Sequence, residues 1–433
     1  MKRLLFCLPV ILLSACATAS SAATSPEPAP APKPASPLEV RVEQLIPFVS
    51  GKIAPEAYVT PGFMQALPSD QFSAFLKTLV GQIGQPIKIV EVERFGPNLA
   101  RVTVEFEKAI APIEIRIEAN APNLVSEFLV KPPTVKGDNI EKISSDFKAL
   151  PGQAGFVVQL LNEEAETAQI NAQQQFAIGS VFKLYVLAEL ASQIEAGQRK
   201  WSDVVLLDRL TYSSPATDNW PRGTPVTLQT LATWMISVSD NAATDQLIYV
   251  LGRDAVEQKL ASIGHSAPDK TLPLLTTVEA FVLKSNPGLL ARFEKATEAQ
   301  QRDMLDNETV ALSYDNVDLS KFGSAPLAIN SVEWFASPAD ISLLLNHLRR
   351  INSKTALDIM GVNKGVVPTS AAKWQYLGYK GGSESGVIAM SFLAQSKGGE
   401  WYAISGAWNN PAKEVDNAAF AALMTRLLDN VAN

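Results

Sequence analysis

The stretch Phe176-Ala-Ile-Gly-Ser-Val-Phe-Lys-Leu184 contains Ser180 and Lys183, and the mainly apolar residues 185–194 follow it. The pattern predicts a helix that begins near Ser180. Residues three positions apart share a helical face, so hydroxyl and amine should lie side by side. A helix start can stabilise an oxyanion, and a lysine with a lowered pKa can accept a serine proton. The stretch can therefore supply a nucleophile and its base, although serine is also a common helix N-cap.

A second polar motif, Ser239-Asp240-Asn241, lies between two apolar segments with helical character, residues 231–238 and 244–251. A short polar connection of this kind is expected to face a cleft. The alternative is an ordinary helix cap, because Ser, Asp and Asn all favour helix N-termini.

A third motif, Lys380-Gly381-Gly382-Ser383, is flanked by apolar and aromatic residues, which predicts a strand. Glycines inside a strand usually mark the close approach of a ligand or of another backbone segment. When the motif is considered alone, a plain hairpin turn is the alternative.

Ser-x-x-Lys, Ser-Asp-Asn and Lys-Gly-Gly occur here in the order that is typical of class A β-lactamases and penicillin-binding proteins. On these motifs, residues 150–433 resemble the family of penicillin-recognising serine enzymes. The resemblance implies an α+β, β-lactamase-like fold, in which an antiparallel sheet is flanked by helices and an all-helical lobe is added. Strand-like segments near both ends of this region and a mainly helical middle, residues 180–350, agree with that expectation.

The resemblance also implies a role for each matched residue. Ser180 would be the nucleophile, Lys183 its general base, and Ser239 the group that passes a proton to the leaving group. Lys380 would support Ser239 electrostatically and attract a substrate carboxylate. The backbone N–H groups of Ser180 and Ser383 would form the oxyanion hole. The other members of the implied substrate and oxyanion site are Asn241, Gly382 and Ser385.

Two departures from the family pattern bear on activity. Position 381 is Gly where the family usually has Thr or Ser, so one hydroxyl is missing from the carboxylate site. The Glu-x-x-Leu-Asn string that carries the deacylating glutamate of class A enzymes does not occur. Glu279 is the nearest candidate for that base, and a solvated helix residue is the alternative. Without such a base, an acyl-enzyme would be hydrolysed slowly.

The two cysteines and two histidines of the chain restrict its chemistry. Cys7 lies in the apolar N-terminal run and would be lost on processing, so no disulfide, zinc site or thiol catalysis is expected. Neither His265 nor His347 lies in a motif typical of catalysis, which disfavours a Ser-His-Asp triad and a multi-histidine metal site. No metal and no cofactor are expected. A net charge of −7 without a basic cluster disfavours nucleic-acid binding.

Residues 1–15 have the pattern of a bacterial lipoprotein signal peptide. Two basic residues precede a short apolar run, residues 4–13, which is too short to span a bilayer. The residues Leu-Ser-Ala-Cys that end at Cys16 resemble the lipoprotein cleavage box, so Cys16 would become the lipidated first residue. A plain signal peptide that is cut near Ala22 or Ala23 is the alternative.

The residues after the expected cleavage site indicate where the protein would reside. Ala17 stands where an acidic residue would signal retention in the inner membrane, so a periplasmic protein anchored to the outer membrane is expected. Residues 16–37 are small, polar and rich in proline, which is typical of an extended tether.

Residues 38–134 are predicted to form a small α+β domain. Two segments with helical spacing, residues 38–49 and 68–83, precede apolar strand candidates between residues 87 and 130. This order favours a curved antiparallel sheet with helices packed on it. The pattern resembles the cystatin-like or ketosteroid-isomerase-like accessory domain that precedes β-lactamase-like domains in some bacterial proteins. No isomerase-type pair of acids can be placed in a pocket from the sequence, so a structural module that covers or extends the cleft is favoured over a second active site.

The leading functional expectation is a serine hydrolase that acts through an acyl-enzyme. Its substrate would be a β-lactam, a D-amino-acid peptide derived from peptidoglycan, or a small ester, and weak β-lactamase or esterase activity is favoured over efficient resistance. The alternative is a sensor that binds a β-lactam or peptidoglycan fragment in the same cleft without turnover. A cell-wall carboxypeptidase or endopeptidase is a third alternative.

Overall fold

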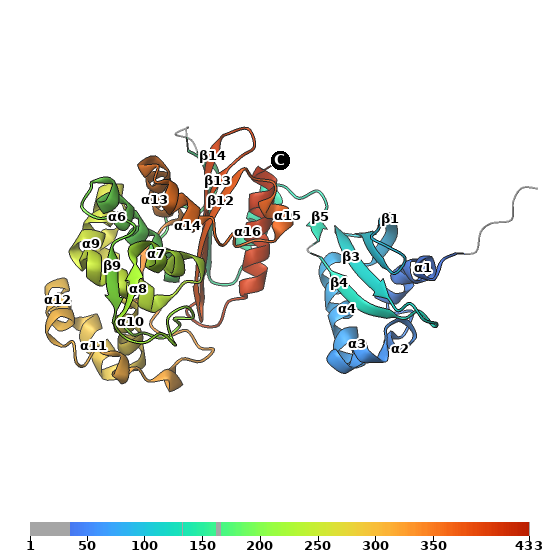
Figure 1. The fold of residues 1–433 in the computed structure, drawn as a ribbon, viewed down its shortest axis with the longest axis horizontal. Helices are drawn as coiled ribbons and strands as arrows, with labels where there is room; N and C mark the ends of the chain where they lie inside the picture. The colour runs from blue at the N-terminus through green and yellow to red at the C-terminus, as the bar shows by residue number, and fades with distance from the viewer. Residues whose placement is uncertain (1–34, 132, 162–165, 433) are drawn as a thin grey trace, which may run out of the picture. The chain divides into compact units, whose positions relative to one another are not determined.

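The structure is a computed structural model that describes residues 35–131, 133–161 and 166–432. The described residues form two compact units that divide between residues 136 and 137 (Figure 1). Each unit has its own hydrophobic core. The expected signal peptide, Cys16 and almost all of the tether lie outside the described residues, so lipidation and a periplasmic location stay predictions. Among the described helices, none is long and apolar enough to cross a membrane.

The first unit consists of helices followed by an antiparallel sheet (Figure 1). The helices are α1 (Pro37–Val49), α2 (Pro55–Tyr58), α3 (Pro61–Ala66) and α4 (Ser69–Ile83). The strands, in the order β1-β2-β3-β4 with β5 paired to β3, are β1 (Pro86–Arg94), β2 (Leu99–Phe106), β3 (Ala109–Ile117), β4 (Val125–Val130) and β5 (Thr134–Val135).

Buried and partly exposed side chains alternate along the strands of this unit, and the buried ones form its core. Val102, Val104 and Phe106 of β2 are fully buried, while the residues between them are partly exposed, which is the period of two of a half-buried strand. Leu45 and Phe48 of α1 pack into the same hydrophobic cluster. The unit is therefore α+β, and its likeness to a cystatin-like domain stays a prediction.

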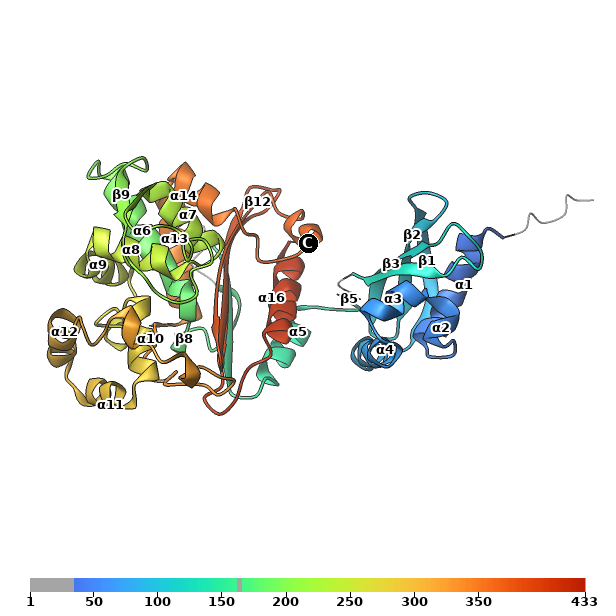
Figure 2. The same ribbon diagram turned by 60° about the horizontal axis from the view of Figure 1, so that its bottom comes forward.

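The second unit is organised around a five-stranded antiparallel sheet with the order β12-β13-β14-β6-β7. Helices α5, α15 and α16 lie on one face, and the other helices of the unit gather over the opposite face (Figures 1 and 2). Strand β12 lies at the edge of the sheet, so one side of its backbone is free of strand partners. The elements are β6 (Gln153–Leu160), β7 (Glu166–Ile170), β12 (Tyr376–Glu384), β13 (Val387–Gln395), β14 (Trp401–Asn409), α5 (Ile140–Lys148) and α16 (Asn417–Val431).

The middle of the second unit is mainly helical, as expected. Its helices are α6 (Lys183–Glu195), α7 (Leu228–Ser237), α8 (Asn241–Leu251), α9 (Arg253–Ile263), α10 (Thr277–Ser285), α11 (Pro287–Lys295), α12 (Glu298–Asn307), α13 (Pro338–Ile351), α14 (Lys354–Met360) and α15 (Pro368–Ala371). Two short ribbons join them, β8 (Phe176–Ala177) with β11 (Phe335–Ala336), and β9 (Val204–Leu207) with β10 (Thr224–Thr227). The observed architecture confirms the expected α+β fold with a helical lobe.

Helix α6 passes through the centre of this unit. Every residue from Lys183 to Ala191 is buried. A helix that is apolar on all sides belongs in a protein core, and Lys183 and Glu189 are the polar exceptions in this stretch. Burying an amine is costly unless it is hydrogen-bonded or loses its charge, so the surroundings of Lys183 decide its chemistry.

Candidate active site

Ser180 lies on the short 3-10 helix η1 (Gly179–Phe182), which follows β8 and continues directly into α6. Gly179 has a left-handed φ of 47°, a conformation that glycine adopts without steric cost, so the chain turns sharply here. The predicted helix therefore begins as one 3-10 turn that carries Ser180, and Lys183 opens the α-helix.

Lys183 is fully buried, and its amine is held by the Ser239-Asp240-Asn241 loop. Its Nζ donates hydrogen bonds to the Ser239 carbonyl oxygen at 2.7 Å, to Ser239 Oγ at 3.2 Å and to Asn241 Oδ1 at 2.5 Å. Burial lowers the pKa of Lys183 to about 7, although the charges of Asp245 and Asp240 act in the opposite direction. Near neutral pH about half of the amine is therefore neutral, and in that form it donates at most two of these hydrogen bonds and has a lone pair that can accept a proton.

The loop that carries Ser239 is fixed by its middle residue. Asp240 is fully buried and N-caps α8 by accepting a hydrogen bond from the Ala243 amide at 2.8 Å. It also accepts hydrogen bonds from the amides of residues 216–217, at 2.9 and 3.1 Å. Ser239 is held at a φ of 60°, which is uncommon for a residue other than glycine. Asp240 thus fixes the conformation of the loop, while Ser239 and Asn241 accept hydrogen bonds from the Lys183 amine.

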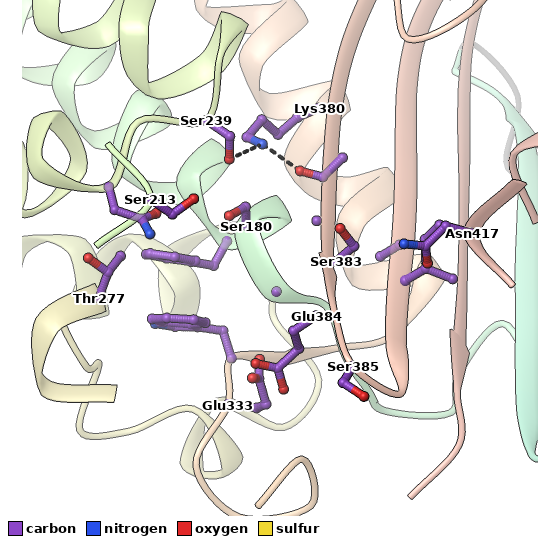
Figure 3. Close-up of a pocket in the computed structure, with 18 of the residues that line it drawn as sticks. Ser180, Ser213, Ser239, Thr277, Glu333, Lys380, Ser383, Glu384, Ser385 and Asn417 are labelled. Carbon is purple, nitrogen blue, oxygen red and sulfur yellow. Dashed lines mark hydrogen bonds between the residues drawn. The ribbon is translucent and has the colours of Figure 1, made fainter. Parts of the chain in front are cut away.

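Lys380 on β12 reaches the same serine from the sheet. Its Nζ donates to Ser239 Oγ at 3.0 Å and to the carbonyl oxygen of Gly381 (Figure 3). Burial lowers the pKa of Lys380 well below its usual range, and the neighbouring Lys183 lowers it further. Ser239 Oγ accepts from both amines, which uses its two lone pairs and leaves its own hydrogen free to be donated.

The backbone of β12 comes very close to η1. A Cβ added to Gly382 would lie 2.4 Å from the Ser180 nitrogen and 2.3 Å from the Ile178 carbonyl oxygen. A Cβ added to Gly179 would lie 3.3 Å from the Ser383 nitrogen. The two amide nitrogens proposed for the oxyanion hole therefore lie at one junction, and glycine is needed there so that the two backbones can approach.

Most of these groups line a cavity of about 790 Å³, whereas the buried Lys183 and Asp240 are not among its lining residues. Phe182 and Trp334 stack at 3.9 Å with nearly parallel rings and form an apolar part of its wall. The Ser385 hydroxyl donates to the carbonyl oxygen of Ser324, so it is already engaged on the protein. Of the sequence-predicted residues, the cavity brings together Ser180, Ser239, Asn241, Lys380, Gly382, Ser383 and Ser385.

Three charged residues of the cavity were not among the predicted site residues. Lys284, Glu333 and Glu384 form an ion-pair cluster that lines the same wall as Ser180. Glu384 directly follows the Lys380-to-Ser383 motif, so its position next to the site could have been inferred. Lys284 and Glu333 come from distant segments that carry no recognisable motif.

Glu279 is placed in a structural position. Both of its carboxylate oxygens bind Arg253, at 2.6 and 3.1 Å, and one of them also accepts from the Thr276 amide as part of a capping box. Glu279 is also absent from the residues that line the cavity around Ser180. The expectation that Glu279 activates the deacylating water is therefore corrected, because its carboxylate is committed to α10 and Arg253.

We expect Glu279→Ala to lower the free energy of unfolding by roughly 2 kcal/mol, because it removes a helix cap and one partner of a largely buried ion pair. Urea unfolding of this variant and of Glu298→Ala, which loses a half-exposed i,i+4 pair, measures the difference. Acyl-enzyme hydrolysis per folded molecule should stay within about threefold, far from the effect of a general base. If a well-folded Glu279→Ala variant hydrolysed its acyl-enzyme a hundredfold more slowly than the wild type, Glu279 would be the base that activates the deacylating water.

The family comparison agrees with this geometry. The chain belongs to the β-lactamase enzyme family, whose model matches residues 138–361, more than half of the 433 residues. Ser180, Lys183 and Ser239 lie inside the matched range, and Lys380 lies beyond it. The first unit lies entirely before it.

Individual relatives are distant. The chain is 27% identical over 143 residues to β-lactamase VEB-1 of Pseudomonas aeruginosa, a match that covers 32% of this chain and 48% of that protein. The chain thus spans about half the length of this curated relative.

Two solved structures are also similar. A β-lactamase from Chitinophaga pinensis is 19% identical with a TM-score of 0.46, and the match covers 68% of this chain and 100% of that one. A β-lactamase from Sphaerobacter thermophilus is 20% identical with a TM-score of 0.45, and the match covers 67% of this chain and 95% of that one.

Proposed function

We propose that the protein is a serine hydrolase that acts through an acyl-enzyme on a β-lactam, a D-amino-acid peptide or a small ester. One observation carries the proposal. Lys183, one turn after Ser180, is fully buried with a pKa of about 7 and is hydrogen-bonded to Ser239 and Asn241. A base of this kind can activate a serine hydroxyl where no imidazole is at hand.

In the acylation step, Ser180 Oγ bonds to the substrate carbonyl carbon and its proton passes to the neutral Lys183 amine. The negative charge that develops on the carbonyl oxygen faces the Ser180 and Ser383 amides. The leaving nitrogen or oxygen takes the Ser239 hydroxyl proton as its bond to carbon breaks. Lys183, now an ammonium, returns a proton to Ser239 Oγ across 3.2 Å. The step thus ends with an ester on Ser180 and a neutral leaving group.

Lys380 is suited to recognising a substrate carboxylate. Burial disfavours its ammonium form in the free protein. A bound carboxylate would favour that form, because an opposite charge at hydrogen-bond distance raises the pKa of an amine. Gly381 has no hydroxyl that could bind the substrate carboxylate beside Lys380. We therefore propose that the protein binds carboxylate-bearing β-lactams more weakly than enzymes with the usual Thr or Ser at this position.

Hydrolysis of the ester requires a water-activating base, and Glu279 is bound to Arg253. We therefore propose slow deacylation. A long-lived acyl-enzyme would also suit the alternative of a sensor that binds without turnover, so the lifetime of the adduct separates the two functions.

Intact-mass spectrometry of the protein treated with benzylpenicillin tests the proposal. We expect the mass to rise by that of one whole penicillin, and peptide mapping to place the addition on Ser180. A return to the unmodified mass within minutes to hours indicates a hydrolase, while an adduct that lasts for days indicates a sensor. A folded protein that gains no mass with β-lactams and cleaves no activated ester would overturn acyl-enzyme chemistry at Ser180.

A further inference from the structure

Lys284 of α10 is held between two carboxylates that come from different parts of the chain. Its Nζ donates to both oxygens of Glu384, at 2.6 and 2.7 Å, and to Glu333 Oε1. The side chains of Lys284 and Glu333 are almost fully buried, whereas that of Glu384 is 30% exposed. All three residues line the cavity that contains Ser180. The acylation chemistry described above uses none of them.

The cluster carries an excess of negative charge when both carboxylates are ionised. Lys284 supplies one positive charge against two negative ones, and its pKa is raised because the two carboxylates outweigh the effect of burial. Burial and the proximity of Glu333 raise the pKa of Glu384 well above its usual range. Within the described part of the chain, Glu333 Oε2 is buried and receives no hydrogen bond. The cluster is therefore balanced either by a proton on Glu384 or by a bound cation that takes the place of that proton.

The position of the cluster relative to the reaction follows from the register of β12. Lys380, Gly382 and Glu384 share one face of this regular strand, and Gly382 lies against the Ser180 nitrogen. At about 3.3 Å per residue, Lys380 and Glu384 are separated by about 13 Å along the strand. Figure 3 shows Lys380 on one side of Ser180 and Glu384 with Glu333 on the other. A carbonyl held at Ser180 would thus have amines on one side and carboxylates on the opposite side.

We propose that Glu384 and Glu333 form a subsite for a protonated amine or a guanidinium on the acyl part of the substrate, on the side of the scissile bond away from Lys380. This inference rests on the proposed function, because it takes the reacting carbonyl to lie at Ser180. An organic cation fits better than a metal ion, since the described residues hold no group of three or more metal-ligating side chains. An ammonium group would pair with the carboxylate of Glu384, which is 30% exposed, and the buried charge of Glu333 beside it would strengthen the attraction. The favoured substrate would carry a carboxylate at its leaving-group end and a cation at its acyl end.

Two isosteric penicillins test the proposal directly. Benzylpenicillin that carries a para-aminomethyl group is compared with its para-ethyl analogue, which has the same shape and no charge. Second-order acylation rate constants are measured at neutral pH, where the primary amine is protonated. The reaction is quenched at set times and the intact mass of the protein is measured. We expect wild-type protein to react about tenfold faster with the amine, which is the order expected for one charge-assisted hydrogen bond.

Variants separate recognition from a structural role. Glu384→Gln should bring the ratio of the two rate constants close to one, and Glu333→Gln should lower it, with thermal unfolding used to check that each variant is folded. The matched control is Glu308→Gln, whose carboxylate is also paired on both oxygens and is 31% exposed, but lies with Arg292 on the surface. This control should keep the tenfold ratio.

The outcomes are distinct. Equal rates for the two penicillins in the wild type would overturn the subsite and leave the hydrolase proposal intact. A Glu384→Gln variant that slows both reactions equally would show that the cluster only ties α10 to β12, and it would also overturn the subsite. If neither penicillin acylates the folded wild type, the proposed function is wrong, and the subsite, which rests on it, is overturned with it.

Discussion

Replacing Lys183 by methionine is expected to slow acylation of Ser180 by about 10³-fold, the loss that follows removal of a general base. Methionine matches the length of the buried stem and brings no charge, so the packing of α6 should be retained. The rate is measured as the gain in mass with benzylpenicillin. Lys259→Met is the control, since Lys259 also lies largely buried beside a carboxylate, Glu189, away from the cavity.

The same base sets the pH dependence of the wild type. Lys183 acts in its neutral form, and its folded-state pKa is about 7, so the neutral fraction rises with pH and levels off above 7. Below pH 7 the acylation rate should fall about tenfold per pH unit. An acylation rate that does not change from pH 5 to 9 would show that Lys183 is not the base. A Lys183→Met variant that acylates at a rate within tenfold of the wild type would show the same.

Gly382→Ala is expected to reduce acylation by about 10²- to 10³-fold, which is the cost of losing one oxyanion-hole donor. The added methyl group would lie 2.3 Å from the Ile178 oxygen and 2.4 Å from the Ser180 nitrogen. Both are backbone atoms, so β12 and η1 must move apart and the Ser180 and Ser383 amides separate.

The control for this variant is Gly323→Ala. Gly323 lines the same cavity, and a Cβ added there meets no heavy atom within 4 Å. Single-turnover acylation kinetics and crystal structures of both variants measure the effect. If Gly382→Ala acylates as fast as Gly323→Ala, the junction of β12 with η1 does not form the oxyanion hole.

The parts of the site that are local in sequence could be predicted from it. Ser180 and Lys183 are one turn apart, and the Ser-Asp-Asn and Lys-Gly-Gly motifs are each contiguous, so helix and strand periodicity place their side chains. Thr276-Thr-Val-Glu279 is itself a capping-box pattern. That local signal favours the structural role that Glu279 has in the fold.

The parts that depend on tertiary contacts could not be predicted. The cluster at Lys284 joins residues separated by 49 and 100 positions, and no spacing rule connects them. In the first unit, helices before strands could be predicted from periodicity, but the short helices α2 and α3 could not. They begin at Pro55 and Pro61, where proline suits the first helical turn, and they are too short to show a repeating pattern.

The sharing of one hydroxyl by two buried amines has a thermodynamic consequence. Both lysines that contact Ser239 Oγ favour loss of a proton, so the free protein holds fewer protons here than an exposed lysine pair would. A ligand with a carboxylate favours uptake of a proton by these amines as it docks, whereas a neutral ester does not. Affinity for anionic ligands is thereby coupled to the acidity of the surroundings, and affinity for uncharged ones is not.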